Sequence, residues 1–311
     1  MARWLGSGGV DQIILAVNHL SDRLKIEVGH SAADVRIVFS VEEKPLGTAG
    51  PIRLAAGFMG NDQPFLVTNG DIVSNIDVSA MLKLHKERNA EATIALVSVA
   101  DPTPFGSVLT DPSGLVRKFE EKSRGSSLTN LVNAGVYVLS PRVIDSIPSG
   151  RPVSLEREVF PKIAENRRMQ AWKHDGYWYD IGRISEYIRA NKELLEMREF
   201  TNSGRVADKR NGSHIVQPAY LGTESRLGTG ATVGPRTILS HNVIIGEGSI
   251  VRDSIIFEET EIGDRTVVED AIVGEKVIIG KDSRIGQGSI IAGQLSIPAG
   301  SVVSPNSVLL C

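Results

Sequence analysis

A repeat of six residues governs the C-terminal part of the chain. Apolar residues recur there at steps of six, with slips at Ile262 and Val273. This period fits neither the 3.6-residue helix nor the two-residue strand alternation, and it predicts a triangular solenoid whose sides each point one apolar side chain inward. Three hexads make one coil, so we expect roughly five coils of parallel β-helix. The predicted inward residues are Ile215, Leu221, Leu227, Val233, Leu239, Ile245, Val251, Phe257, Ile262, Val273, Ile279, Ile285, Ile291, Ile297 and Val303.

Glycine follows many of these apolar residues, as at Gly222, Gly246 and Gly263. We expect these glycines at the corners, where the chain turns sharply and a positive φ favours glycine.

The preceding residues follow a different rhythm. Short apolar runs predict strands at 13–17, 35–41, 65–68, 92–99 and 132–139. Helical spacing between them predicts one helix after an Asp77 N-cap and another from Ile184 to about Phe200. The alternation predicts an α/β domain with a largely parallel sheet. We therefore divide the chain into an α/β domain (1–200), a polar linker (201–213) and a β-helix (214–311).

Composition excludes several classes of protein. Lys and Arg number 34 and Asp and Glu 37, for a net charge of -3, which argues against a nucleic-acid-binding protein. The only cysteine is Cys311, so neither an intrachain disulfide nor a cysteine metal site is expected. No apolar run reaches the roughly 18 residues of a membrane span. We expect a cytoplasmic protein without membrane contact.

Two turns after predicted strands could bind a ligand. The segment 42–52 follows a strand, and Gly47 and Gly50 would let the backbone approach a flat ligand, although Pro-Leu-Gly is also an ordinary turn. Asp71 directly follows the strand 65–68, and strand carboxyl ends are where ligands bind in open α/β sheets. Asp71 could hold a divalent cation, or be a solvated residue of an Asn-Gly turn.

Three further segments carry polar groups suited to a cation or to a sugar phosphate. Asp180 lies in 178–182 before a predicted helix, so it could be an N-cap or a second carboxylate for the same cation. The segments 119–122 and 132–137 supply an acid, a base and an amide that could bind sugar hydroxyls and a phosphate.

The combined series of segments resembles the mannose-1-phosphate guanylyltransferases (GDP-mannose pyrophosphorylases), a family of sugar-1-phosphate nucleotidyltransferases. The resemblance covers nearly the whole chain, including the β-helix. The segments that carry it are 39–50, 69–71, 119–122, 133–135, 154–161 and 178–182. It implies an α/β Rossmann-like (GT-A type) nucleotidyltransferase domain followed by a left-handed parallel β-helix of hexapeptide repeats.

The resemblance also implies an activity, in which a nucleoside triphosphate, GTP, reacts with mannose 1-phosphate and pyrophosphate is released. It assigns Mg²⁺ binding to Asp71 and Asp180, and contact with the sugar's phosphate to Lys122. It assigns nucleotide binding to Leu46, Gly47, Thr48, Ala49 and Gly70. It assigns sugar binding to Gly106, Glu120 and Asn133. A thymidylyl, uridylyl or heptose-specific enzyme would look similar, so the base and the sugar stay open.

The chain departs from the family at its start. Members begin with a strand, a glycine-rich loop ending in arginine, and a phosphate-facing lysine, whereas Arg3 to Leu20 already resemble the helix and strand that follow these. Because that loop would bind the triphosphate, we expect slow turnover from a polypeptide starting at Met1. We also expect the strands beside the absent one to lack a partner. A missed upstream start is favoured over a truncated gene or a degenerate relative.

Two alternatives to the enzyme stay open. A non-catalytic regulatory subunit would bind a nucleotide sugar and act through the β-helix on a catalytic relative. A hexapeptide-repeat acyltransferase would use His241 as its base, although a surface histidine is the favoured interpretation. Flat faces and open ends of the β-helix favour a homo-oligomer or hetero-oligomer.

Overall fold

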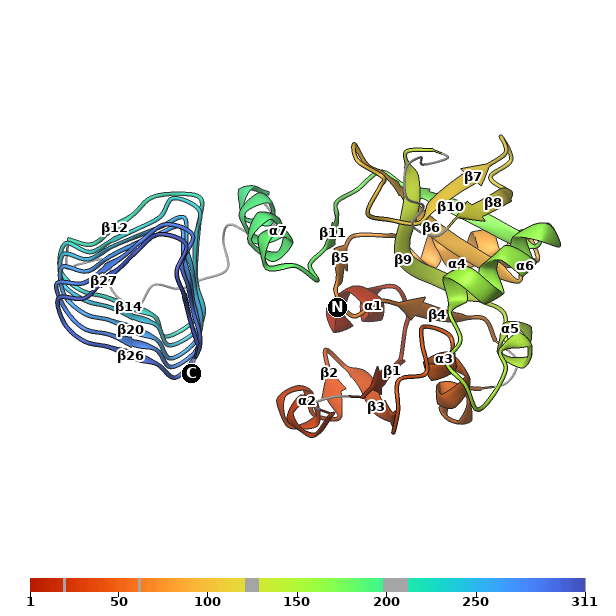
Figure 1. Ribbon diagram of the computed structural model, residues 1–311, viewed down its shortest axis with the longest axis horizontal. Helices are drawn as coiled ribbons and strands as arrows, with labels where there is room; N and C mark the ends of the chain where they lie inside the picture. Colours follow the sequence, from red (N-terminus) through yellow and green to blue (C-terminus); the bar gives the residue numbers. More distant parts are fainter. Residues whose placement is uncertain (19–20, 61–62, 121–128, 198–211, 311) are drawn as a thin grey trace. The chain divides into compact units, whose positions relative to one another are not determined.

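The computed structural model describes residues 1–18, 21–60, 63–120, 129–197 and 212–310 (Figure 1). The chain forms two compact units, Met1–Ile181 and Gly182–Cys311. Each has its own apolar core. Within the described residues, no helix combines the length and the apolarity needed to cross a bilayer.

The first unit contains two main sheets and a small one. In the first sheet, β1 (Gln12–Val17) is parallel to β3 (Val35–Val41), which also pairs with the short antiparallel β2 (Ser31–Ala32). The second sheet has the order β10-β6-β9-β7-β8, with β4 also on β9. Its strands are β4 (Phe65–Thr68), β6 (Ala92–Ser98), β7 (Ser107–Thr110), β8 (Val116–Glu120), β9 (Leu131–Leu139) and β10 (Met169–His174). The small sheet pairs β5 (Ile72–Ser74) with β11 (Trp178–Asp180).

The expectation of a largely parallel sheet is wrong. In the second sheet only β6 and β10 run parallel, and the other pairings are antiparallel. The apolar runs report burial on both faces, as in β6, where Ala92 to Val97 are all buried, and burial does not fix strand direction. Among the described strands, β1 pairs only with β3, and β4 pairs only with β9.

One helix of the first unit begins where the sequence signals predict. Asp77 caps α4 by accepting a 2.9 Å hydrogen bond from the Ala80 amide, which confirms that prediction. Pro161 lies in the first turn of α6, after a wide π-type turn, η2. The elements are α1 (Ala2–Ser7), α2 (Ser21–Val28), α3 (Gly50–Ala55), η1 (Ala56–Phe58), α4 (Val78–Glu87), α5 (Arg142–Ser146), η2 (Leu155–Val159) and α6 (Phe160–Glu165).

The second unit is a parallel β-helix, as predicted. Its three sheets have the orders β12-β15-β18-β21-β24-β27, β13-β16-β19-β22-β25-β28 and β14-β17-β20-β23-β26. The strands are β12 (His214–Ile215), β13 (Ala219–Leu221), β14 (Arg226–Leu227), β15 (Thr232–Val233), β16 (Thr237–Leu239), β17 (Ile244–Ile245), β18 (Ile250–Arg252), β19 (Ile255–Ile256), β20 (Glu261–Ile262), β21 (Val267–Glu269), β22 (Ile272–Val273), β23 (Ile278–Ile279), β24 (Arg284–Ile285), β25 (Ile290–Ile291), β26 (Ser296–Ile297), β27 (Val302–Val303) and β28 (Val308–Leu309).

Nearly all predicted inward residues lie in its core, with one correction. Ile256, not Phe257, is the fully buried residue of β19, at 0% exposure. The chain therefore shortens one side of the coil directly after Val251. Ile256 pairs in register with Leu239 and Val273 of the neighbouring coils, which keeps the apolar column continuous.

The corner glycines need a different explanation from the predicted one. Gly222, Gly246 and Gly263 do not have a positive φ, which is adopted two residues later by residues such as Gly248 and Arg265. A Cβ on Gly263 would lie 2.5 Å from the Lys281 nitrogen of the next coil. Glycine is required there because successive coils approach too closely for a side chain.

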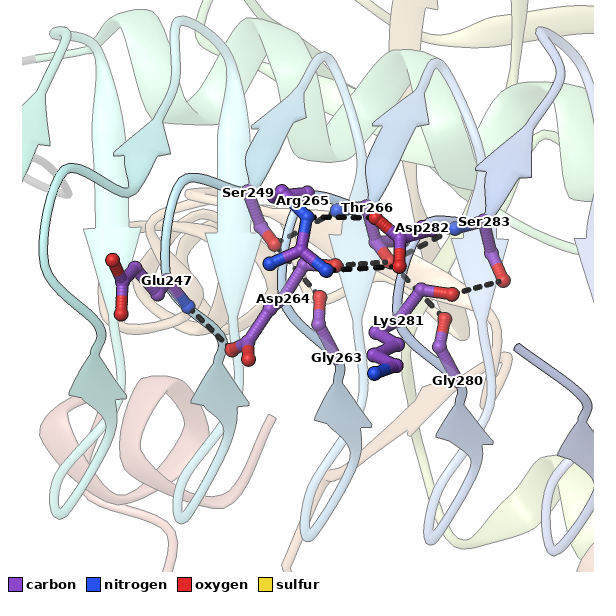
Figure 2. A network of polar contacts seen from close by, with 10 residues as sticks. All are labelled: Glu247, Ser249, Gly263, Asp264, Arg265, Thr266, Gly280, Lys281, Asp282 and Ser283. Carbon is purple, nitrogen blue, oxygen red and sulfur yellow. Dashed lines mark hydrogen bonds and ion pairs between the residues drawn. The ribbon is translucent and has the colours of Figure 1, made fainter. Parts of the chain in front are cut away.

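Buried hydroxyl groups connect successive coils (Figure 2). The Ser249 hydroxyl donates to the Gly263 carbonyl (2.7 Å) and accepts from the Thr266 amide (3.0 Å). The Thr266 hydroxyl repeats this one coil later with Gly280 and Ser283, at 3.1 and 3.3 Å. These bonds satisfy polar backbone groups inside the solenoid, where water is excluded. On the surface, Arg265 and Asp282 form an ion pair across the same coils.

Helix α7 (Ile184–Glu196) belongs to the unit of the β-helix. Lys192 forms a 2.6 Å ion pair with Asp270, and Ala190 and Leu195 of the helix are buried. The division into compact units follows Ile181, so α7 groups with the β-helix, to which the Lys192–Asp270 ion pair joins it. Residues 201–211 of the expected linker lie outside the described residues.

Candidate active site

A cleft of about 350 Å³ opens in the first unit. Its walls come from the turn after β3, the residue after β4, the start of β5, the residues just before β7, the first half of β9, the segment before α6, and β11. The lining residues are Thr48, Asn69, Ile72, Phe105, Gly106, Asn133, Ala134, Gly135, Ser154, Glu156, Arg157, Trp178 and Asp180. Segments that lie far apart in the sequence thus meet around one cavity.

The loop 46–49 is held against the segment 153–156 by backbone hydrogen bonds. The Ala49 amide donates to the Val153 carbonyl and the Val153 amide donates to the Leu46 carbonyl, both at 2.9 Å. Gly47 has a φ of +77°, and a Cβ there would collide with the Val153 carbonyl oxygen. Glycine is therefore required at 47 both for its conformation and for the close contact.

Side chains complete this contact. The Thr48 hydroxyl donates to Glu156 Oε2 (2.6 Å) and accepts from the Leu155 amide (2.8 Å). The Ser154 hydroxyl also donates to Glu156 Oε2, at 2.9 Å. The donor of Thr48 is already used, so this side chain fixes the loop, and the loop offers its backbone to a ligand.

The sugar-binding residues predicted from the resemblance lie where β7 and β9 meet. The Asn133 amide donates to the Gly106 carbonyl at 2.9 Å. The Asn133 side chain accepts from the Gly135 amide (2.9 Å) and donates to the Tyr137 hydroxyl (2.8 Å), which fixes its orientation at the cleft. Glu120 ends β8 opposite Ser107, next to Gly106 on the neighbouring strand.

Aromatic side chains form the wall beside Asp180. The rings of Phe105 and Trp178 contact edge to face with centroids 5.4 Å apart. The Trp178 indole donates to the Ala134 carbonyl at 2.8 Å, which ties β11 to β9. These contacts place a half-buried aromatic wall along one side of the cleft.

The two predicted metal ligands lie on neighbouring chain segments. Asp180 is opposite Ile72 in the antiparallel pair of β11 and β5, and the Ile181 amide donates to the Asp71 carbonyl at 2.9 Å. Asp180 is half-buried and lines the cleft, whereas Asp71 is exposed in the turn before β5. The described residues contain no cluster of three or more His, Cys, Asp or Glu side chains suited to a metal ion.

The structure thus brings Thr48, Gly106, Asn133 and Asp180 to one cleft. The other predicted residues that it describes are adjacent in the chain or on a neighbouring strand: Leu46, Gly47, Ala49, Gly70, Asp71 and Glu120. Lys122, the predicted phosphate ligand, lies outside the described residues.

Sequence reasoning missed the segment 154–157 as part of the site. Ser154, Glu156 and Arg157 line the cleft, but the segment served only to support the family resemblance. A usable signal was present, since a hydroxyl and adjacent opposite charges stand just before a predicted helix. Next to them, the hydrogen-bonded Arg151 lowers the pKa of the Glu158 carboxyl.

His241, the base of the acyltransferase alternative, is exposed at a corner of the β-helix.

Comparisons with known proteins agree with this architecture. The family described as nucleotidyl transferase matches residues 1–197, and the family described as GMPPB C-terminal domain matches residues 215–310. The chain is 37% identical to a probable mannose-1-phosphate guanylyltransferase 3 of Arabidopsis thaliana over 63% of its own length and 61% of that protein. It is 36% identical to the mannose-1-phosphate guanyltransferase beta-A of Xenopus laevis, over 59% of this chain and 52% of that one.

One similar solved structure is HddC from Yersinia pseudotuberculosis complexed with GMP-PN. It is 28% identical, with a TM-score of 0.53, over 61% of this chain and 82% of that one. The chain therefore spans little more than half the length of the curated relatives it matches and most of this solved structure.

Proposed function

The chain belongs to the nucleotidyl transferase family, and from this premise we propose that it transfers a nucleotidyl group from GTP to mannose 1-phosphate, giving GDP-mannose and pyrophosphate. The names of the relatives from Arabidopsis and Xenopus support the choice of mannose 1-phosphate and of a guanylyl group. The complex of HddC with GMP-PN supports a guanine nucleotide as the donor.

One observation carries the proposal. Four residues assigned to nucleotide, sugar and metal from the sequence line the same cleft, although they come from separate parts of the chain. In this proposal the loop 46–49 binds the nucleotide through its backbone, and Asn133 and Gly106 bind the sugar. The hydrogen bonds of Asn133 to Gly135 and Tyr137 hold its amide in place before a substrate arrives.

The chemistry is an in-line displacement at phosphorus. A phosphate oxygen of mannose 1-phosphate attacks the α-phosphorus of the nucleotide and forms a new P–O bond. The bond from the α-phosphorus to the oxygen that bridges it to the β-phosphate breaks, and pyrophosphate leaves with the electron pair. The nucleophile is already an oxyanion, so the protein contributes positioning and neutralisation of charge.

Asp180 and Asp71 suit a magnesium ion. They lie on adjacent chain segments, of which Asp180 lines the cleft, and Mg²⁺ is commonly bound by one or two carboxylates together with phosphate oxygens and water. A bound Mg²⁺ would neutralise negative charge on the phosphates. Asp180, which lines the cleft, would lie nearer the reacting groups.

A turnover assay tests the proposal. We expect pyrophosphate release from GTP and mannose 1-phosphate in the presence of Mg²⁺, and we expect Asp180→Asn to lower kcat by at least roughly tenfold. Glu165→Gln, an exposed carboxylate of α6 outside the cleft, is the matched control and should leave kcat unchanged. Binding of GDP-mannose without any turnover would instead favour the regulatory subunit, and binding of neither nucleotide nor sugar phosphate would refute both.

A further inference from the structure

The cleft contains a cation to which neither the resemblance nor the proposed function assigns a role. Among the described residues that line it, Arg157 is the only one with a positive charge. The other charged lining residues, Glu156 and Asp180, are carboxylates. Both substrates of the proposed reaction carry several negative charges on phosphate oxygens. A cleft whose other charges are negative would repel them unless a cation compensates.

The neighbours of Arg157 already have partners. Glu156 accepts from Thr48 and Ser154, and Glu158 is paired with Arg151 at 2.7 Å. The Arg157 guanidinium forms no ion pair with any carboxylate of the described residues, and its side chain is exposed to the cleft. Its donors are therefore available to a ligand.

The backbone around Arg157 is fixed. Its amide donates to the Ser154 hydroxyl at 3.3 Å, and the Glu158 amide donates to the Ser154 carbonyl at 3.0 Å. Pro161 has no amide hydrogen, so it cannot bond back to the Arg157 carbonyl, and the chain makes the wide turn η2 at this point. Wide turns of this kind occur frequently at functional sites.

We propose that Arg157 binds phosphate oxygens of the substrate in this cleft. The planar guanidinium presents paired N–H donors that match two phosphate oxygens. Through Glu156, the same segment holds Thr48 and hence the loop 46–49, so one stretch of chain would position the nucleotide loop and contact the phosphates. This inference rests on the proposed function, because that function supplies the phosphorylated ligands.

Binding titrations of the full chain test it. The probes are GTP, guanosine, mannose 1-phosphate and mannose, each measured by calorimetry with wild type, Arg157→Gln and Arg157→Lys. We expect Arg157→Gln to weaken GTP or mannose 1-phosphate by roughly tenfold to a hundredfold, and the probe that weakens identifies the phosphate contacted. Guanosine and mannose should bind all three proteins equally. Arg157→Lys keeps the charge but not the paired donors, and should lose less affinity.

Arg142→Gln is the matched control, because Arg142 lies on α5 and does not line the cleft. It should bind all probes as wild type does. Equal affinity of wild type and Arg157→Gln for both phosphorylated probes would overturn the inference while leaving the proposed function intact. Equal weakening of guanosine and GTP would also overturn it, because the loss would then not depend on phosphate. Wild type that binds no phosphorylated probe would overturn the proposed function itself.

Discussion

At the scale of single residues, the site depends on a few positions where only one type of side chain fits. Gly47 combines a positive φ with a carbonyl oxygen where a Cβ would be, and Thr48 uses its hydroxyl both as donor and as acceptor. These constraints explain why a short turn of ordinary composition is a specific structure. Substitution of Gly47 therefore tests whether the conformation of the loop 46–49 depends on these two constraints.

Gly47→Ala should damage the nucleotide loop. The methyl group would both strain the backbone and strike the Val153 carbonyl, at a combined cost of roughly 1–3 kcal/mol in the free energy of unfolding. Urea denaturation measures this cost, and a GTP titration should show weaker binding. Gly57→Ala is the control, since a Cβ there meets nothing within 4 Å and Gly57 has no positive φ. Equal stability of the two variants would contradict the explanation of Gly47.

His85 makes the first unit sensitive to pH. It is 2% exposed, with Nδ1 2.9 Å from the Thr93 hydroxyl and Nε2 3.1 Å from the Ser140 hydroxyl. Burial, with a smaller contribution from the charge of Lys86, lowers the pKa of His85 from 6.5 to about 4. Between these values the unfolded chain binds the proton and the folded chain does not, so stability is complete above pH 6.5 and falls as the pH drops toward 4.

The expected loss is at most about 1.4 kcal/mol per pH unit across that window. Urea denaturation between pH 7 and pH 5 can be followed by tryptophan fluorescence, because Trp4, Trp172 and Trp178 all lie in the first unit. His85→Gln removes the titrating group, so its stability should change less over the same range. A wild-type stability that stays constant from pH 7 to pH 5 would exclude this role.

At the scale of elements, the β-helix shows which features a sequence period can predict. The step of six identified the sides of the coil and most of the core, because each side must place one apolar residue inside. It placed the inward residue of β19 one position late, at Phe257, since two adjacent apolar residues, Ile256 and Phe257, compete there and only pairing with neighbouring coils decides between them. Contacts between coils also explain the glycines better than local conformation does.

Gly263→Ala should destabilise the β-helix through such a contact. The new methyl group would lie 2.5 Å from the Lys281 nitrogen, so the next coil must shift, at a cost of roughly 1–3 kcal/mol. Thermal melting followed by circular dichroism measures the effect. Ser296→Ala, at an exposed position on β26, should melt as wild type does. A Gly263→Ala protein with an unchanged melting temperature would show that the coils can separate without cost.

At the scale of the whole molecule, the positions of β1, β3, β4, β6 and β9, several segments that line the cleft, and the solenoid could be predicted from the sequence. Sheet direction could not, because burial on both faces gives the same apolar run for parallel and antiparallel strands, as in β6. The role of the segment 154–157 was missed because its contacts with Thr48 join residues more than a hundred positions apart. The grouping of α7 with the β-helix could not be predicted either, because α7 is an ordinary amphipathic helix and its sequence does not specify its partner.

The assignment of α7 to the β-helix gives a test in the full chain. Leu195→Ala removes a side chain that is 3% exposed and should cost roughly 2–5 kcal/mol, as other large-to-small core substitutions do. The β-helix transition seen by circular dichroism should move to lower temperature, whereas tryptophan fluorescence, which reports the first unit, should not. Glu196→Ala, on an exposed neighbour, is the control. A shift in the fluorescence transition alone would place α7 with the first unit.

The in-register stacking of the coils has a consequence for how the length of this protein can vary. Each strand of the solenoid bonds to the strand one full coil away, as Ile215 does with Val233 and Val233 with Val251. Excision or duplication of one entire coil would leave every remaining side chain in phase with its column. Loss of a single residue within a side would turn an apolar side chain outward. Relatives should therefore gain or lose solenoid length in whole coils, and tolerate single-residue indels mainly at corners.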